Sequence, residues 1–259
     1  MSAFHLKAEA LSVGYRDRPV LQNLTLDLPA GQSSAILGPN GCGKSTLLST
    51  LARLLTPSRG KVLLGDIDVH CANSRQLSRR LAILPQFPVA PEGIRVGELV
   101  KRGRTPWRGF LSPWSSADSA ACRNALDAVG MQELAERPLS ELSGGQRQRA
   151  WLALVLAQDT PLLLLDEPTS FLDLPHQIDV LKLLRDRIEK TGTTVVSVLH
   201  DLNLAARFND NLVLLGHAGL VAEGVPETVI TPENLRKAFD LEARVIPDPV
   251  TDRPMVVPL

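Results

Sequence analysis

The stretch SSAILGPNGCGKSTLL, residues 33–48, decides how this chain folds. Five small or apolar residues indicate a buried strand, a glycine-rich turn follows, and the leucines after it are spaced for a helix. Residues 38–45 fit the pattern GxxxxGK[ST], in which backbone amides wrap phosphate oxygens. Because strand, turn and helix follow one another in the order that phosphate binding requires, we predict a nucleotide phosphate loop rather than a chance glycine-rich turn.

Within this loop the residue types suggest separate tasks. The ammonium of Lys44 is expected to reach the β- and γ-phosphates, and the hydroxyl of Ser45 to bind Mg²⁺. Thr46 is expected to add a contact to the α-phosphate. The predicted nucleotide-binding residues of the loop are Gly38, Pro39, Asn40, Gly41, Cys42, Gly43, Lys44, Ser45 and Thr46.

Outward from the loop, apolar patterns place the other elements. Alternation at residues 24–28 predicts a half-buried strand that follows another at 6–13, hence an antiparallel β element. Alternating strands and helices resume after residue 158, which is typical of a parallel sheet, and the tail is expected to contain one short helix. We therefore predict an α/β fold: a P-loop NTPase core whose parallel sheet is flanked by helices, with an N-terminal antiparallel β subdomain and a helical subdomain insert.

The predicted organisation is a single domain spanning residues 1–259. Residues 1–86 and 159–259 form the nucleotide-binding core with its antiparallel β subdomain. Residues 87–158, which read mostly as helices and loops, form the helical subdomain.

Composition excludes several classes of protein. The 28 basic and 28 acidic residues cancel, which argues against nucleic-acid binding by bulk charge. The 44% apolar content excludes a disordered chain. Three cysteines without CxxC spacing indicate neither a disulfide framework nor a zinc site, and favour a reducing cytosol.

Nothing in the sequence predicts a membrane span or an export signal. The longest uncharged apolar run, residues 150–157, is far shorter than the roughly 20 residues that cross a bilayer. The first residues lack the basic and then apolar pattern of an export signal. We therefore expect any membrane role to come from a partner.

Two acids follow the apolar run at 162–165. In P-loop enzymes the first acid after such a strand holds the Mg²⁺ shell, so Asp166 is expected to bind the metal. Glu167 then lies where it can act as a general base toward a water that attacks the γ-phosphate. Taken alone, the two acids could mark an ordinary turn after a strand, but the phosphate loop favours the catalytic interpretation.

A second anion site is predicted at LSGGQ, residues 142–146, because its glycines precede an apolar helical run. One nucleotide cannot occupy two distant sites on one chain. This suggests that Ser143, Gly144 and Gly145 bind the nucleotide of another subunit, and hence a dimer. The alternative is a flexible hinge, since SGG alone is common in linkers.

Together GPNGCGKST, LSGGQ, LLLLDEP and His200 occur in the order that resembles ATP-binding cassette (ABC) proteins, the ATPase subunits of ABC transporters. The resemblance covers nearly the whole chain. It implies ATP and Mg²⁺ as cofactors, hydrolysis of ATP to ADP and phosphate coupled to solute import, and two head-to-tail cassettes. Each ATP would lie between one copy's phosphate loop and the other's LSGGQ, which includes Gln146.

The same resemblance implies further roles. Tyr15 would stack on adenine, although a lone tyrosine at a strand end also fits edge packing. Gln86 would join the Mg²⁺ or the attacking water, and His200 would act as the switch histidine. Asp173 matches the D-loop, the segment that contacts the opposite subunit, where Phe171 replaces the more usual alanine. The predicted catalytic residues are Glu167, His200, Gln86 and Lys44, and the predicted metal-binding residues are Ser45, Gln86 and Asp166.

Three longer segments resemble the cassettes that serve iron–siderophore, haem and cobalamin uptake: VGELVKRGRTPW, SFLDLPHQIDVLKLL and LHDLNLAARF. The first expectation is a bacterial ferric siderophore importer, with haem or cobalamin import as the alternative. A non-transport cassette would need a coiled-coil insert or fused cassettes, and a P-loop kinase has no use for LSGGQ. A pure nucleotide-binding module would show no ATPase activity.

The partners implied are a second copy of the chain, two integral-membrane permease subunits and, indirectly, a periplasmic or lipoprotein substrate-binding protein. No nucleic acid is expected. The implied location is peripheral, at the cytoplasmic face of the inner membrane.

Overall fold

The computed structural model describes residues 5–15, 18–109 and 112–259. Its centre is a six-stranded sheet in the order β10-β9-β3-β8-β7-β6, in which β10 alone runs antiparallel to its neighbour. Every residue of β3, β7, β8 and β9 is buried, as expected for parallel strands covered on both faces. The strands are β3 (Ser33–Leu37), β6 (Leu81–Leu84), β7 (Leu162–Asp166), β8 (Thr194–Val198), β9 (Asn211–Gly216) and β10 (Gly219–Gly224).

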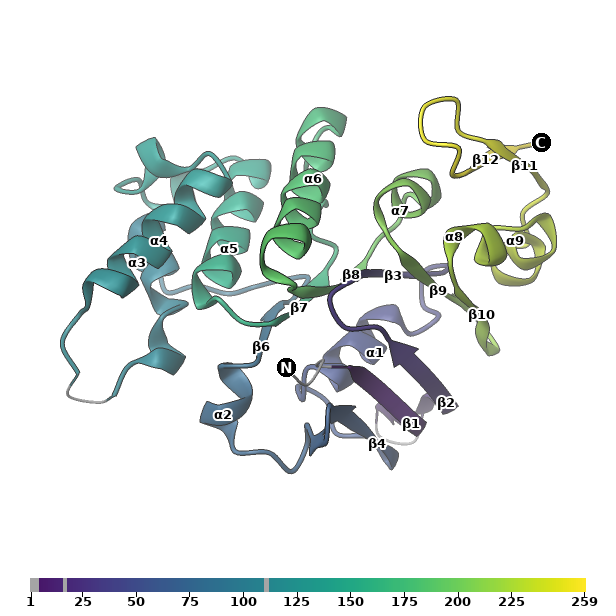
Figure 1. The fold of residues 1–259 in the computed structure, drawn as a ribbon, viewed down its shortest axis with the longest axis horizontal. Helices are drawn as coiled ribbons and strands as arrows, with labels where there is room; N and C mark the ends of the chain where they lie inside the picture. The colour runs from purple at the N-terminus through teal and green to yellow at the C-terminus, as the bar shows by residue number, and fades with distance from the viewer. Residues whose placement is uncertain (1–4, 16–17, 110–111) are drawn as a thin grey trace.

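One face of this sheet is covered by helix α1 (Lys44–Leu51) and, beyond it, a second sheet (Figure 1). Leu162 and Leu164 of β7 point to this side and share a buried cluster with α1. The second sheet is antiparallel in the order β2-β1-β4-β5, which confirms the predicted N-terminal β element. Its strands are β1 (Leu6–Tyr15), β2 (Arg18–Leu28), β4 (Arg59–Leu64) and β5 (Ile67–Asp68), and the short helix α2 (Ser74–Ser78) follows them.

On the opposite face lie the helices α6 (Leu174–Thr191), α7 (Leu202–Phe208), α8 (Pro226–Val229) and α9 (Pro232–Phe239) (Figure 1). The chain ends in a hairpin, β11 (Ala243–Pro247) and β12 (Pro254–Pro258). It is joined to α7 by Asn203, whose side chain accepts from the Val256 amide at 2.7 Å and donates to its carbonyl at 3.3 Å. The sequence predicted one short helix in this tail and no strands, because Pro247, Pro254 and Pro258 lie at strand ends and obscure the strand pattern.

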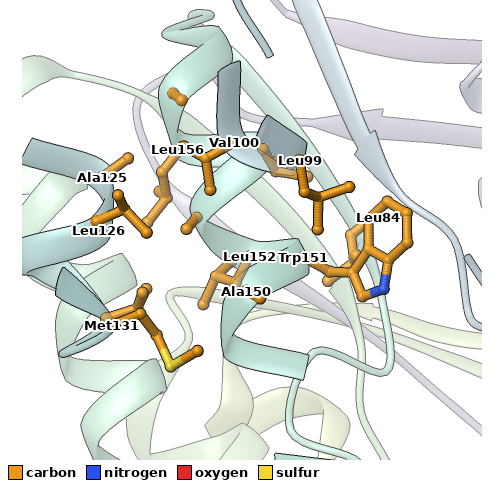
Figure 2. Packing of buried hydrophobic residues seen from close by; sticks show 14 of the residues in the cluster. Leu84, Leu99, Val100, Ala125, Leu126, Met131, Ala150, Trp151, Leu152 and Leu156 are labelled. Carbon is orange, nitrogen blue, oxygen red and sulfur yellow. The ribbon is translucent and has the colours of Figure 1, made fainter. Parts of the chain in front are cut away.

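Between β6 and β7 the chain forms three main helices, α3 (Val96–Arg102), α4 (Ser116–Ala128) and α5 (Gly144–Gln158). They pack through apolar side chains such as Leu99, Leu126 and Leu152, in a cluster that extends to the central sheet (Figure 2). A buried ion pair, Arg104 Nε to Asp118 Oδ1 at 3.0 Å, ties the segment after α3 to α4. None of the described helices combines the length and apolar character needed to span a membrane. The predicted α/β fold class is confirmed.

Candidate functional site

The order of the parallel strands brings the predicted motifs to one edge of the sheet. Strands β3, β8, β7 and β6 are consecutive neighbours. Their carboxyl ends lead into the phosphate loop, His200, the Asp166–Glu167 pair and Gln86 respectively. The carboxyl edge is where open α/β sheets bind ligands.

The phosphate loop needs glycine at defined positions. Gly38 has φ +150°, and a Cβ there would lie 2.4 Å from the carbonyl oxygen of Leu215. Gly43 has φ +103°, and a Cβ there would lie 2.8 Å from Val20 Cγ1. Helix α1 begins at Lys44, so the amides at its start lack intrahelical acceptors and can bind an anion.

Lys44 is buried, and its Nζ donates to the carbonyls of Gly38 and Pro39, each at 2.9 Å. An ammonium has three donors, so one remains for a phosphate oxygen. The hydroxyl of Ser45 donates to Asp166 Oδ1 at 3.1 Å. Burial raises the pKa of Asp166, and a cation beside this hydroxyl and carboxylate would favour its ionised form. These oxygen donors fit Mg²⁺, which prefers oxygen ligands.

Glu167 is the best-connected side chain of the site. Its Oε1 accepts from Gln86 Nε2 at 2.7 Å and lies 2.7 Å from His200 Nε2. Its Oε2 accepts from the hydroxyl of Ser170 at 2.8 Å. Burial alone would raise the pKa of Glu167, but the hydrogen bonds from His200, Ser170 and Gln86 outweigh it and the pKa is lowered. Glu167 is therefore an ionised carboxylate that can accept a proton.

Sequence reasoning missed two contributors to this arrangement. Ser170 follows Glu167 by three residues in the same turn, and its hydroxyl donates to one carboxylate oxygen. A serine at this spacing could have been recognised from the sequence. Gln148, on α5, donates from Nε2 to the carbonyl of Glu167 at 3.1 Å. No local pattern indicates that contact. Glu167 itself has φ +52°, unusual for a residue with a side chain, so these neighbours hold a strained backbone.

The second predicted anion site lies at the start of α5. Ser143 caps this helix: its Oγ accepts from the Gln146 amide at 3.2 Å, and Gln146 Oε1 accepts from the Ser143 amide at 3.1 Å. Ser143 and Gly144 are exposed. Gln146 therefore has a structural task within the chain in addition to the nucleotide contact expected of it.

Asp173 and Tyr15 are two further residues with predicted roles. Asp173 caps α6, where its Oδ1 accepts from the His176 amide at 3.3 Å. Tyr15 ends β1 with its side chain exposed. Strand order thus brings Lys44, Ser45, Asp166, Glu167, Gln86 and His200 together. Within the described residues, no hydrogen bond or ion pair joins them to Tyr15, Ser143 or Asp173.

Residues 21–170 match the ABC transporter family. The chain belongs to this family. It is 47% identical to the achromobactin transport ATP-binding protein of Dickeya dadantii, covering 98% of this chain and 94% of that protein. It is 45% identical to the ferric enterobactin transport ATP-binding protein of Escherichia coli, over 100% of this chain and 95% of that protein. It is 39% identical to the cobalamin import ATP-binding protein of Halobacterium salinarum, over 98% of this chain and 63% of that protein.

Solved ABC structures share the fold. A metal-chelate type ABC transporter in an inward-facing conformation matches with TM-score 0.84 and 32% identity, covering 100% of this chain and 98% of that one. A dimeric ATP-binding cassette in a post-hydrolysis state with ADP and phosphate matches with TM-score 0.77 and 26% identity, covering 85% and 98%. This ABC cassette is therefore an ATP-binding, ATP-hydrolysing transporter subunit.

Proposed function

We propose that this cassette powers the import of a ferric siderophore across the bacterial inner membrane. The support is similarity: relatives named for achromobactin and ferric enterobactin transport are 47% and 45% identical over nearly the full chain, against 39% for a cobalamin relative. Haem or cobalamin is the second candidate cargo. The cassette's own geometry supports ATP hydrolysis and does not select among these cargoes.

In the proposed reaction Glu167 takes a proton from the water that attacks the γ-phosphate. The observation that carries this role is its ionised carboxylate, held by His200, Gln86 and Ser170. Lys44 stabilises negative charge on the transferred phosphoryl group. Mg²⁺, when bound by Ser45 and Asp166 with Gln86 nearby, would neutralise phosphate charge.

Two copies would complete the site. The phosphate loop and Asp166 come from one copy, and Ser143, Gly144, Gly145 and Gln146 from the other, head to tail. Support comes from the exposed start of α5 and from the dimeric form of the solved cassette. Tyr15 would stack on adenine, and Asp173 would face the opposite copy.

We further propose that residues 87–158 act as a helical subdomain beside the core of residues 1–86 and 159–259. Two membrane-embedded permease subunits would dock near the loop after Gln86, where Phe87 and Val89 are exposed. The cassette would then lie on the cytoplasmic face of the inner membrane. A separate substrate-binding protein would deliver the cargo, and no nucleic acid is involved.

The decisive experiment is Glu167→Gln. The amide cannot take the proton, so ATPase activity should fall by about 10²–10⁴-fold while MgATP binding persists. The variant should accumulate as an ATP-bound dimer, measured by light scattering coupled to size-exclusion chromatography. A variant that stays monomeric with ATP and hydrolyses at the parental rate would overturn both the base and the shared site.

The cargo is tested separately. The cassette would be reconstituted with its permease and binding protein in proteoliposomes loaded with MgATP. Uptake of an iron-loaded siderophore would support the siderophore assignment. Uptake of haem or cobalamin in its place would replace that assignment with the other cargo.

A further inference from the structure

One hydrogen bond joins helix α5 to the backbone of the proposed catalytic base. Gln148 Nε2 donates to the carbonyl oxygen of Glu167 at 3.1 Å. Gln148 is only 8% exposed, so this hydrogen bond is largely shielded from water and is stronger than a hydrogen bond at the surface. It crosses from the helices between β6 and β7 to the residue that follows β7.

The backbone that accepts this hydrogen bond is strained. Glu167 has φ +52°, a conformation that costs energy in a residue with a side chain and persists only where its surroundings hold it. Its carbonyl also accepts from the Ser170 amide at 3.1 Å, a hydrogen bond within the same turn. Within the described residues, the hydrogen bond to this carbonyl from outside the turn comes from Gln148. Gln148 therefore helps to fix the direction in which the Glu167 side chain leaves the backbone.

The helix that carries Gln148 also carries the second anion site. Gln148 follows Gly144 by four residues, which is about one turn, or about 6 Å, along the axis and on the same face of α5. A Cβ on Gly145 would lie 3.1 Å from Leu172 Cδ2, so the start of α5 packs closely against the segment after Glu167. A nucleotide held at these glycines would fix the part of α5 on which Gln148 stands.

The opposite end of α5 is tied to the core by another glutamine. Gln158 Nε2 donates to the carbonyls of Ser78 and Leu81 at 2.7 and 3.0 Å. Leu81 begins β6, so this contact lies at the amino end of the strand, whereas Gln86 follows its carboxyl end. Gln158 thus matches Gln148 in residue type, helix and kind of hydrogen bond, and it differs in its distance from the catalytic edge.

We propose that Gln148 is a positioning residue for Glu167, the base of the ATP site on its own copy. The inference rests on the shared site and the catalytic base proposed above. The amide of Gln148 holds the strained turn so that the carboxylate meets the attacking water. Because Gln148 stands one turn from the glycines that bind the other copy's ATP, the position of the base in one site depends on the helix that completes the other site.

The first test is Gln148→Met, which removes the donor and nearly keeps the side-chain volume. In the full chain with MgATP, kcat should fall at least about tenfold while KM stays parental, because a displaced base slows the chemical step and leaves the ATP contacts intact. The ATP-bound dimer should accumulate, measured by light scattering coupled to size-exclusion chromatography, since dimers form and turn over slowly. Gln158→Met is the control and should keep the parental kcat without dimer accumulation.

Mixed dimers separate positioning of the base from support of the second anion site. One copy of each dimer carries Glu167→Gln, which leaves a single working site, and two affinity tags isolate the mixed form. With Gln148→Met on the Glu167→Gln copy, the working base belongs to a parental copy, so the first-turnover rate should be parental. With Gln148→Met on the other copy, the working base loses its support and the rate should fall at least about tenfold.

The reverse pattern in the mixed dimers would mean that Gln148 supports the LSGGQ glycines, and it would overturn the inference. Parental kcat in Gln148→Met, or an equal loss of kcat in Gln158→Met, overturns it as well. Gln148→Leu, a second replacement without a donor, is tested in the same way if Gln148→Met fails to fold. If Glu167→Gln alone hydrolyses ATP at the parental rate, the proposed base fails and this inference falls with it. An inactive Glu167→Gln beside a fully active Gln148→Met overturns the role of Gln148 alone.

Discussion

At the scale of single residues, the hydrogen-bond donors around Glu167 determine whether its carboxyl group is ionised. Burial favours its neutral form, and three hydrogen bonds favour its charged form. The net effect is a lowered pKa, so the carboxyl group of Glu167 stays ionised at pH values below the usual range of glutamate pKa values. Removal of any of these donors should raise the pKa of Glu167.

His200→Ala tests this balance. With His200 gone, burial remains and the pKa of Glu167 rises. Because the proposed base acts in its ionised form, the acid limb of the pH–rate profile should move to higher pH. Ser170→Ala should shift the limb in the same direction by a smaller amount. An unmoved limb in His200→Ala would show that another group controls it.

Lys44→Ala addresses nucleotide affinity. It removes a charged donor from the phosphates, which contributes about 1.5–3 kcal/mol in typical cases. ATP should therefore bind about 10- to 100-fold more weakly. Isothermal titration with MgATP measures the change. Unchanged affinity would show that the ammonium stays with the carbonyls of Gly38 and Pro39 when ATP is bound.

At the scale of elements, one half-buried carboxylate joins the starts of two strands to a helix. Asp210 Oδ2 accepts from the amide and the hydroxyl of Ser33, each at 2.9 Å, and Oδ1 pairs with Arg185 of α6. Burial alone would raise the pKa of Asp210, but Arg185 and Ser33 outweigh it and the pKa is lowered. This contact fixes β3 beside β9, and β3 carries the phosphate loop.

Asp210→Ala should lower the free energy of unfolding by about 1.5–3 kcal/mol at neutral pH, measured by urea titration. The lowered pKa means that the ionised form stabilises the fold above the ordinary Asp range. This stability is lost as pH falls through the folded-state pKa, so the variant and the parent should converge in acid. Asp186→Ala is the control, because its exposed pair with Lys190 contributes little. If the difference in unfolding free energy between parent and variant stayed constant with pH, the stabilising role of ionised Asp210 would be refuted.

At the scale of the whole molecule, the surface divides into faces with different expected partners. In the proposed assembly the start of α5 would face a second copy, and the loop after Gln86 would face the permease. The central sheet links these two regions, because its strands β6, β7 and β8 lead into Gln86, Glu167 and His200, the proposed catalytic side chains. ATP hydrolysis should therefore depend on assembly.

Without its permease, the isolated chain should show an ATPase rate per subunit that rises with protein concentration, because a lone copy supplies only half of each site. Dilution below the dimer dissociation constant should abolish most of the activity. The measurement is phosphate release across a concentration series at saturating MgATP. A rate per subunit that is independent of concentration would mean that one chain hydrolyses ATP by itself.

The phosphate loop, the strand that ends at Asp166, the helix after LSGGQ and the class of fold could all be predicted from the amino-acid sequence. These follow from local spacing, because a buried strand, a glycine turn and a helix start each depend on neighbouring residues. The family followed from the order of the same motifs.

Which side chains contact one another depends on how distant segments pack in three dimensions. Gln86 lies 81 residues from Glu167 and reaches it because β6 is the neighbour of β7. Gln148 of α5 donates to the Glu167 carbonyl, and Asn203 of α7 accepts from the Val256 amide of the C-terminal hairpin. Such contacts arise from strand order and helix packing, which act between segments distant in sequence and leave no periodic pattern in either one.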